Sequence, residues 1–466
     1  MNILIKKSVK PIILGVSFYL SIQSALAGVP QVEADKLGVT LTPLGAQMAG
    51  NEKGTIPAWT GCSDLNAPLE QLKSGDRRWN PYPDEKPMYV VTKANMAEYD
   101  SVITDGMKAL LDKFSDMSFP VYATHRNHCA PDDVYKATKL NAVNGKLVGD
   151  AYNSGVEGAI NGIPFPIPSN GLEAKWNMNM RWRGRSFETL TRHVSWTSSG
   201  QKVLGTQAMQ FDQLEFYRPG QTLDEHAKTG YLDWMFYQKA NAPSFRAGEG
   251  LVTRGQSNYA KKSVRDTWQY LLGQRRVRRA PSVGWDTPDF IVSGTDFFDE
   301  VFGGPITPKE RFTYKLIGKK ELLIPYNNNI LFSMDEDEIF VGTHHNPKAI
   351  RWELHRVWVV EATLADGQRH AVPRRMHYID EDTWGTSLMD GYDGEGKIWR
   401  VSINPAYYLP DMPGMMSAYS DILYVLDGDI STRNLVMPNF NYQMKFVPVK
   451  DQDVFTPDYL ANESDR

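Results

Sequence analysis

Cysteine is scarce in this chain: Cys62 and Cys129 are the two cysteines among 466 residues. So few thiols exclude a disulfide-dense scaffold. An even count in an oxidising compartment favours one disulfide, and two buried free thiols are the alternative. The loop between the two cysteines is long, so the chain-entropy model gives such a disulfide about 4 kcal/mol of stabilisation.

Long apolar runs are also rare. One lies near the N-terminus, at residues 12–22, and it is shorter than the roughly 20 residues that a membrane span needs. Three lysines precede it within the first ten residues, and Ala25-Leu26-Ala27 follows it as an A-x-A cleavage motif. These features predict a secretory signal peptide, residues 1–27, cleaved after Ala27, and a mature protein in a bacterial periplasm. An uncleaved membrane anchor is the alternative.

The chain has no excess of basic residues. Its formal net charge is −4, and removal of residues 1–27, which contain three lysines and no acid, changes this value to −7. Nucleic-acid binding needs a net basic surface or a large basic patch. The composition therefore argues against a nucleic acid as partner.

Recognisable catalytic signatures are missing as well. The chain contains no G-x-S-x-G, P-loop or H-E-x-x-H motif. The H-x-x-H-C segment at 125–129 and the adjacent His344–His345 lack the spacing of a metal-ligand set. Acidic runs such as Asp335–Glu338 and Asp380–Asp382 are typical of solvated turns. We therefore predict no catalytic residue, no metal site and no cofactor, although triads are recognised by geometry and a hidden hydrolase stays an alternative.

The chain divides by texture into an N-terminal arm, residues 28–150, and a strand-rich part, residues 151–466. The arm is rich in glycine, proline and turn residues at its start. Two helices are predicted in it. One spans 93–114, where apolar residues recur at helical spacing, and the other spans 131–141, where Pro131 suits the first turn.

The strand-rich part begins after a glycine- and proline-rich loop, residues 155–171. Aromatic and β-branched residues then alternate with turn residues, which predicts strands. The predicted strands are Trp176–Arg183, Glu188–Trp196, Gln207–Tyr217, Thr267–Val277, Phe312–Ile317, Leu354–Thr363, Met376–Ile379, Lys397–Ile403, Ile422–Leu426 and Gln443–Val447. A T-x-x-E capping box at Thr222 and Glu225 predicts a helix that runs towards Lys239.

One predicted strand has an apolar face over its full length. In RWELHRVWVVEAT one face carries apolar residues and a single arginine, Arg356, whereas the other begins with charged and histidine side chains. The residues of the apolar face are Trp352, Leu354, Trp358, Val360 and Ala362. Such a face must be covered by helices, by a second sheet or by a ligand, and a filled core is the default.

The segment from Trp268 to Gly303 joins aromatic residues, a cluster of arginines and an acidic loop, Asp296–Glu300. The arginines are Arg275, Arg276, Arg278 and Arg279. Two of them continue the aromatic face: Arg276 and Arg278 on a regular strand, or the other two after a bulge at Gly273. Guanidinium groups bind carboxylate and phosphate, so the cluster predicts a contact for an anionic headgroup or an acidic partner surface. A rim of salt bridges to the acidic loop is the equal alternative.

Long and unusual motifs run through nearly the whole mature chain. They are LGVTLTPLGAQMAGNEKGTIPAWTG, VYATHR, GVEGAINGIPFPIPSNGLEAKWN, RWRG, GQRRVRRAP, KKELLIPYNNN, ELHRVWVVEATL, HYIDEDTW and YDGEGKIWRV. On these segments the chain resembles the domain-of-unknown-function 1329 family. The tract W-x-Y-L, R-R-V-R-R and S-G-T-D-F is similar to outer-membrane lipoprotein-sorting (LolA/LolB-like) proteins.

The resemblance implies an α+β fold. A strongly curved antiparallel sheet, an unclosed LolA/LolB-like barrel, would wrap around helices, with residues 28–150 as an irregular and helical N-terminal arm. The resemblance further implies a periplasmic carrier for a lipid or other amphipathic hydrophobic ligand, in envelope lipid transport or outer-membrane trafficking. An outer-membrane β-barrel and an inner-membrane RND-type transporter are the implied protein partners.

On this hypothesis aromatic residues hold the tail of the ligand and the four arginines meet its head or a partner. The predicted hydrophobic contacts are Trp176, Trp182, Trp268, Tyr270, Trp352 and Trp358. One alternative is a structural subunit of an exporter complex, with the sheet filled by its own side chains. A less favoured one is a periplasmic hydrolase that acts on a lipid or an envelope polymer.

Overall fold

The computed structural model describes residues 28–62, 79–150, 154–197, 199–261, 265–280, 311–409, 412, 414–416, 421–426, 430–431 and 444–464. The predicted signal peptide, residues 1–27, and the acidic loop Asp296–Glu300 lie outside the described residues. Within the described part of the chain, no helix is both long enough and apolar enough to cross a membrane.

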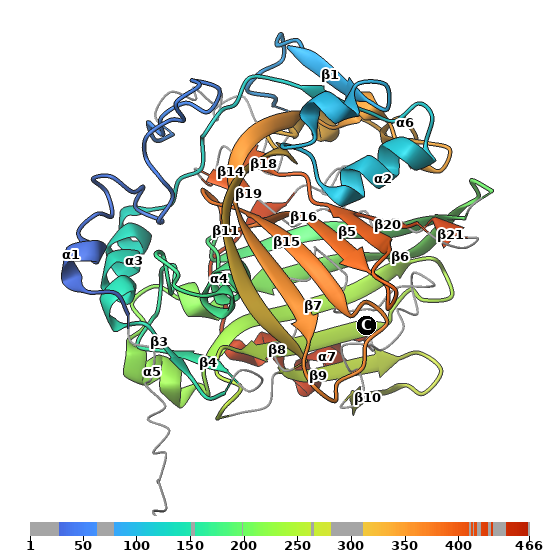
Figure 1. The fold of residues 1–466 in the computed structure, drawn as a ribbon. Coiled ribbons are helices and arrows are strands. Elements are labelled where there is room, and N and C mark those ends of the chain that lie inside the picture. Colours follow the sequence, from blue (N-terminus) through green and yellow to red (C-terminus); the bar gives the residue numbers. More distant parts are fainter. Residues whose placement is uncertain are drawn as a thin grey trace, which may run out of the picture.

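Two eight-stranded sheets form the body of the molecule (Figure 1). In the first, which we call sheet I, six strands follow one another in the chain and each is antiparallel to the next. They are β5 (Ser186–Thr197), β6 (Lys202–Gln213), β7 (Leu232–Ala242), β8 (Gly250–Gln256), β9 (Arg265–Leu271) and β10 (Arg276–Arg279). Two short strands, β21 (Ile430–Ser431) and β22 (Lys445–Phe446), pair with β5.

The second sheet, sheet II, is built around β14. Its strands are β1 (Tyr89–Thr92), β2 (Ser118–Val121), β11 (Phe312–Pro325), β14 (Trp352–Leu364), β15 (Arg374–Asp380), β16 (Thr386–Tyr392), β17 (Ile398–Ile403) and β20 (Ile422–Val425). All pairs are antiparallel except β2 with β14, which are parallel. The arm therefore contributes two strands, β1 and β2, to this sheet.

Short elements complete the fold. The hairpins are β3 (Lys146–Val148) with β4 (Gly155–Glu157), β12 (Phe340–Val341) with β13 (His344–His345), and β18 (Tyr407–Leu409) with β19 (Gly414–Met416). The α-helices are α1 (Gln31–Ala34), α2 (Asp105–Lys113), α3 (Asp132–Asn144), α4 (Gly171–Asn179), α5 (Leu223–Lys228), α6 (Glu336–Ile339) and α7 (Pro457–Ser464). The 3-10 helices are η1 (Met96–Tyr99), η2 (Glu215–Tyr217), η4 (Asn329–Ser333), η5 (Pro347–Ala349) and η6 (Gln452–Phe455).

The two sheets are successive parts of one curved, open surface. The chain leaves sheet II at Val425, the end of β20, and enters sheet I at Ile430, the start of β21. A bulge between Leu316 and Gly318 interrupts the register of β11, where Gly318 has φ 129°. Bulges of this kind bend a strand, and the long strands of sheet II are visibly curved in Figure 1. The predicted α+β fold with a strongly curved, unclosed sheet is confirmed.

Both faces of sheet I are covered. Phe211 on β6 is paired with Glu188 on β5, so Phe187 and Phe211 lie on opposite faces. Phe187 belongs to a core around α4, whereas Phe211 stacks on Phe455 in a core beside α7. Sheet I is thus placed between α4 and α7.

Sheet II has the same arrangement. Val359 belongs to the same core as Met107 of α2, and its neighbour Val360, on the opposite face, belongs to the same core as Trp176 of α4. The molecule is therefore layered in the order α2, sheet II, α4, sheet I, α7, and α4 lies between the sheets in Figure 1. The face of each sheet that looks towards α4 is called the inner face below.

Helix α4 corrects one prediction, since Trp176–Arg183 was expected to be a strand. Asn170 caps the helix, because its side chain accepts a hydrogen bond from the Glu173 amide. Every residue from Glu173 to Met178 is buried. A helix without a polar face shows no helical periodicity in its sequence, and this explains the error.

Other element bounds were partly right. The predicted helix at 93–114 is wrong as a single element, because η1 and α2 replace it and Thr104 caps α2. Helix α3 and the capping box at Thr222 and Glu225 are confirmed. The helix that follows this box is shorter than expected, since it ends at Lys228 and β7 begins at Leu232.

Candidate functional site

The turn between β15 and β16 carries three consecutive acidic residues, Asp380, Glu381 and Asp382. Each is at most 3% exposed, so the expectation of a solvated turn is wrong. The Thr383 amide donates to the Asp380 carboxylate at 3.0 Å, and Trp384 adopts φ 59° and donates its amide to the Asp380 carbonyl. The buried Trp384 side chain belongs to the core around α4. Because Trp384 is buried in this core, the acidic turn that precedes it is buried as well.

Basic side chains neutralise two of the three acids. Asp382 accepts two hydrogen bonds from Arg126, at 2.8 Å from Nε and 2.7 Å from Nη2. Glu381 accepts from Arg356 Nε and from Lys319 Nζ, each at 2.6 Å. Burial by itself would raise the pKa of Asp382, but the charge and hydrogen bonds of Arg126 outweigh it and the pKa is lowered.

The same arginines also donate hydrogen bonds to the first part of the N-terminal arm. Arg126 Nη2 donates to the Gln47 carbonyl at 2.8 Å, and Arg356 Nη2 donates to the Ala49 carbonyl at 2.7 Å. These carbonyls belong to a segment with little regular structure, whose polar groups need other partners. The charged turn therefore anchors the arm to sheet II.

A disulfide also links two parts of the arm to each other. Cys62 and Cys129 are bonded, with their Cα atoms 6.1 Å apart, so the predicted disulfide is present. Cys129 follows Arg126 closely in the chain. The covalent link and the charged turn therefore hold neighbouring parts of the arm.

A second group of charges lies beside the first, around Glu353 on β14. Glu353 accepts from Arg351 Nε at 2.6 Å, from Asn327 Nδ2 at 3.0 Å and from the His125 amide at 2.9 Å. Its Oε2 atom also lies 3.1 Å from His355 Nε2. The carboxylate is fully buried, and these partners lower its pKa against the opposing effect of burial.

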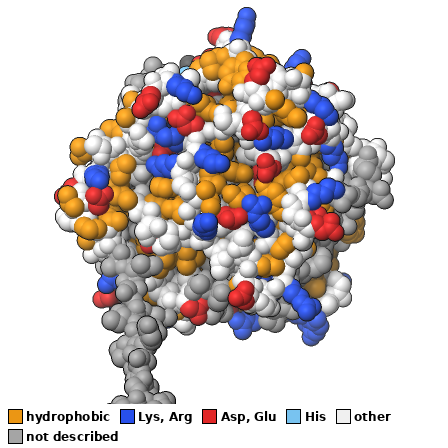
Figure 2. Space-filling model, in the orientation of Figure 1, with side chains coloured by type: hydrophobic (Ala, Val, Ile, Leu, Met, Phe, Trp, Pro, Cys, Tyr) orange, Lys and Arg blue, Asp and Glu red, His pale blue; other side chains and the backbone are white. Residues whose placement is uncertain are grey.

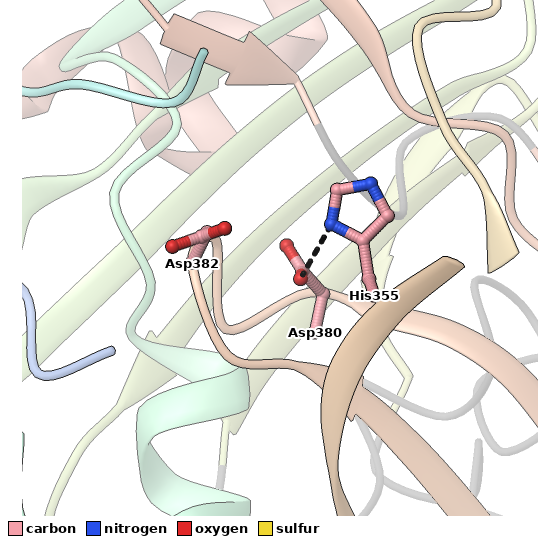
Figure 3. A group of neighbouring side chains, drawn as sticks. All are labelled: His355, Asp380 and Asp382. Carbon is pink, nitrogen blue, oxygen red and sulfur yellow. Dashed lines mark ion pairs between the residues drawn. The ribbon is translucent and has the colours of Figure 1, made fainter. Parts of the chain in front are cut away.

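Asp380 differs from its neighbours because no lysine or arginine contacts it among the described residues. Its one contact with a basic side chain among the described residues is with His355, whose Nδ1 lies 4.0 Å from Asp380 Oδ1. Burial, and next the Asp382 charge, raise the pKa of Asp380 to about 6. His355, Asp380 and Asp382 point towards one another in Figure 3, and each offers one ligand atom within 4.8 Å of the others. Among the described residues, this group is the one whose geometry could hold a metal ion.

Local sequence patterns did not predict this group, because its members come from separate motifs. His355 belongs to ELHRVWVVEATL, and Asp380 and Asp382 belong to HYIDEDTW. The antiparallel register pairs Val357 with Asp380, which brings the end of β15 beside His355. A signal was nevertheless present, since HYIDEDTW places three acids directly after an apolar strand and before a tryptophan.

The histidines of the two motifs considered in the sequence lie elsewhere. His125 Nε2 is 2.7 Å from Glu85 Oε1, and its ring stacks on Tyr82. His345 Nδ1 lies 2.6 Å from the Tyr424 hydroxyl. Both side chains therefore have structural partners.

The six aromatic residues predicted to line a ligand cavity are divided among three cores. Trp352 lies in the core with α2; Trp176, Trp182 and Trp358 lie in the core with α4; Trp268 and Tyr270 lie in the core with α7. All are buried except Trp268 and Trp358, which are half-buried. The structure thus brings Trp176, Trp182 and Trp358 together and separates the others from them. A role in ligand binding stays a prediction for each of the six.

The segment Thr267–Val277 is a hairpin rather than the single strand that was expected. Strand β9 ends at Leu271, Arg275 lies in the turn with φ 48°, and β10 begins at Arg276. The hairpin register places β10 at the edge of sheet I. The four arginines are all exposed.

The hairpin separates the strand arginines into two sets. Register pairs Arg276 with Leu271 and Arg278 with Gln269, so both lie on the inner face of sheet I. Arg279 pairs with Trp268 on the opposite face, and it forms an ion pair with Asp266. The acids that the sequence analysis proposed as partners lie outside the described residues.

The inner face of sheet I also carries apolar side chains that the sequence analysis did not select. They are Trp234 and Phe236 on β7, Leu251 on β8 and Leu271 on β9. Each is half-exposed, and none belongs to the cores around α2, α4 and α7. The Trp234 indole donates to Asp212 at 2.8 Å, and its ring lies 5.4 Å from that of Phe236. These four residues are called the inner strip below.

The outward face of sheet II has a different character. Figure 2 shows acidic and basic side chains interspersed over the face that looks towards the viewer. On this face Arg374 Nε donates to Glu361 at 2.8 Å, and the guanidinium lies over the Tyr392 ring. Half-exposed paired charges of this kind suit contact with water.

Comparisons with known proteins place the chain in a family. The model of the family described as "Protein of unknown function (DUF1329)" matches residues 90–461. An uncharacterized protein of Pseudomonas aeruginosa is 40% identical over 402 residues, which cover 83% of this chain and 84% of that protein. The family match begins within β1 and includes α2, β2 and α3 of the arm.

The solved structures that match this chain have much lower sequence identity to it. A lipoprotein-sorting protein domain from Vibrio parahaemolyticus is 12% identical with a TM-score of 0.40, covering 62% of this chain and 98% of that one. A DUF1329 family protein from Desulfovibrio piger is 11% identical with a TM-score of 0.39, covering 62% of this chain and 96% of that one. A LolA superfamily protein from Nitrosomonas europaea is 11% identical with a TM-score of 0.34. Because the family model matches residues 90–461, the chain belongs to the DUF1329 family.

Proposed function

We propose that this protein is a periplasmic carrier that binds a lipid or another amphipathic hydrophobic molecule against the inner face of sheet I. The observation that carries the proposal is the inner strip, whose four apolar side chains are half-exposed and lie outside the three cores. The predicted signal peptide supports a periplasmic location.

The inner strip offers a surface of suitable shape for an extended tail. It crosses neighbouring strands from β7 to β9, and strands lie about 4.8 Å apart, so it extends over roughly 10 Å across the sheet. Small residues lie between its members, since Phe236 pairs with Thr253 and Thr253 with Thr267. Each methylene that leaves water for such a surface contributes about 0.8 kcal/mol before the cost of ordering the ligand.

Positive charge continues the same face at the sheet edge. Leu271 of the inner strip is paired with Arg276, and Arg278 follows on that face. Both arginines are exposed, and neither forms an ion pair with a described residue. An apolar strip that ends beside two guanidinium groups suits a molecule with an apolar tail and a carboxylate or phosphate head.

The test is organic extraction of the purified mature protein followed by mass spectrometry, together with titration of a fluorescent fatty acid. We expect a co-purifying amphipathic molecule and saturable uptake of the probe. Phe236→Asp should reduce uptake at least tenfold, because it places a charge in the middle of the inner strip. Phe245→Asp is the matched control, since Phe245 is 77% exposed outside the strip and should be neutral.

Two results would contradict the proposal. Absence of any co-purifying molecule together with no uptake of the probe would exclude carriage of this ligand class. Equal loss of uptake in both phenylalanine variants would show that the inner strip is not the binding surface.

A further inference from the structure

We infer that His355, Asp380 and Asp382 form a binding site for one divalent transition-metal ion, zinc or manganese. All three side chains are buried, and their ligand atoms lie within 4.8 Å of one another (Figure 3). One imidazole nitrogen with two carboxylate oxygens is a donor set that both ions accept. This inference rests on geometry alone and does not depend on the proposed carrier function.

The orientation of the His355 ring is the first argument. Its Nε2 lies 3.1 Å from Glu353 Oε2, and an ionised carboxylate accepts a hydrogen bond but cannot donate one. The hydrogen atom therefore belongs on Nε2, and in the neutral ring the lone pair of Nδ1 faces Asp380 at 4.0 Å. A carboxylate that holds the far nitrogen of a metal-binding histidine is the usual second-shell arrangement.

Asp380 supplies the second argument, because it is a buried carboxylate without a basic contact among the described residues. Arg356 and Lys319 are both engaged by Glu381, and Arg126 is engaged by Asp382. Within the described part of the chain, the Asp380 Oδ1 atom has no hydrogen-bond partner. A buried charge is costly unless it is paired or coordinates a metal, and an ion between Asp380 and His355 would provide this pairing.

Tyr326 provides a third and independent observation. Its side chain is fully buried and its ring lies 4.1 Å from that of His355. Its hydroxyl has no hydrogen-bond partner among the residues that the structure describes. Buried polar groups are normally satisfied, so an unpartnered buried hydroxyl on a ring that contacts His355 indicates a missing ligand. A water molecule on the bound ion would satisfy it.

The three ligands can converge with small movements. A tetrahedral ion at about 2.1 Å from its ligands places them roughly 3.4 Å apart, so the group must contract by about an ångström. Asp382 stays available although Arg126 contacts both of its oxygens, because each carboxylate oxygen has a second lone pair. Burial excludes solvent from the site, which favours an ion bound during folding over one that exchanges freely.

The test uses the full mature chain, stripped of metal with EDTA and then titrated separately with Zn²⁺, Mn²⁺, Mg²⁺ and Ca²⁺. We expect one equivalent of Zn²⁺ or Mn²⁺ to stay bound through gel filtration and to raise the Tm by several degrees, because a ligand that binds the folded state stabilises it. The harder ions Mg²⁺ and Ca²⁺ should not bind, because the set includes an imidazole and few oxygens.

Asp380→Asn keeps the shape of the side chain and removes its charge. This variant should fold, should be at least as stable as the metal-free wild type and should lose the bound equivalent together with the Tm shift. Glu98→Gln, at an exposed acid of η1, is the control and should bind as the wild type does. Absence of bound metal and of any Tm shift in the wild type would overturn the inference, and so would unchanged binding by Asp380→Asn.

Discussion

At the scale of single residues, the pKa of a buried acid in this protein depends on the groups that donate hydrogen bonds to its carboxylate. Asp390 on β16 faces the start of α2, where the Gly106 amide at 3.1 Å and the Thr104 hydroxyl at 3.2 Å donate to its carboxylate. The Tyr378 hydroxyl of β15 donates to the same carboxylate at 3.1 Å. A Cβ atom at residue 106 would clash with this carboxylate, so glycine is required there. These neutral donors do not offset burial, which raises the pKa of Asp390 to about 6.

The raised pKa predicts a pH dependence of stability. Because the folded pKa of Asp390 lies above the ordinary value of 3.8, the native state holds this proton more tightly than the unfolded state does. The contribution of Asp390 to the free energy of unfolding should therefore increase as the pH falls from about 6 to about 4. Asp390→Asn lacks this titration, so the free energy of wild type minus that of the variant should rise by up to about 3 kcal/mol over this window.

Urea unfolding of both proteins at a series of pH values measures this difference. Titrations of all other groups cancel to first order between the two proteins, which is why the comparison uses a difference. A difference that is constant with pH would show that Asp390 has the same pKa in both states.

At the scale of elements, the β9–β10 hairpin decides which arginines can act together. Alternation along β10 puts Arg276 and Arg278 on the inner face with the inner strip, whereas Arg279 lies on the other face and Arg275 lies in the turn. The pattern R-R-V-R-R alone does not separate these pairs, because the position of the turn sets the register.

This separation predicts different effects for two double variants. Arg276→Ala with Arg278→Ala should weaken binding of an anionic amphipathic probe roughly tenfold or more and leave a neutral probe unaffected, since an ionic hydrogen bond contributes about 1.5–3 kcal/mol. Arg275→Ala with Arg279→Ala removes the same charge and is the matched control, with little expected effect. Fluorescence titration with a fatty acid and its methyl ester measures both, and equal loss in the two variants would argue against a headgroup contact.

Helix α4 shows how an element can be invisible to local patterns. It lies in one core between the two sheets, so its residues from Glu173 to Met178 are all buried and give no amphipathic period. The same segment reads as aromatic and alternating, which favoured a strand. What decides its conformation is the pair of sheets that enclose it, and these are distant in sequence.

At the scale of the whole molecule, the N-terminal arm is part of the folded unit. It adds β1 and β2 to sheet II, it contributes α2 to a core, and its carbonyls accept hydrogen bonds from Arg126 and Arg356. The disulfide closes this arrangement across a sequence separation of 67 residues.

Loss of the disulfide should therefore destabilise the entire protein. Cys62→Ser with Cys129→Ser should reduce the free energy of unfolding by about 4 kcal/mol, because the unfolded chain regains the entropy of an open loop. Thermal unfolding of the wild type with and without a reducing agent, beside the double variant, measures this effect. The reductant should lower the Tm of the wild type and leave that of the variant unchanged; equal Tm values for all samples would show that the link does not limit stability.

Features that depend on local interactions were predicted from the sequence, whereas features that depend on contacts between distant segments were not. Strands β5 and β14 were located from aromatic and β-branched residues between turns, and helix α3 from Pro131 at its first turn. Arg356, which interrupts the apolar face predicted for β14, is accommodated by its partner Glu381. The disulfide followed from the cysteine count. The acidic turn at Asp380 was misread, because its burial depends on partners from three other segments.

By itself, the sequence determined the family, because long motifs run through the chain, and the strand-rich composition, because aromatic and β-branched residues recur between turns. The resemblance to the family implied the curved sheet, and the count of two cysteines favoured one disulfide. Tertiary structure alone decided that α4 is a helix, that Arg276 and Arg278 share a face with the inner strip, and that His355 meets Asp380. Each of these facts depends on strand register or on burial between the two sheets. A change of register by one residue would reverse every face, and the register depends on the position of the turns and on which face is buried in the tertiary structure.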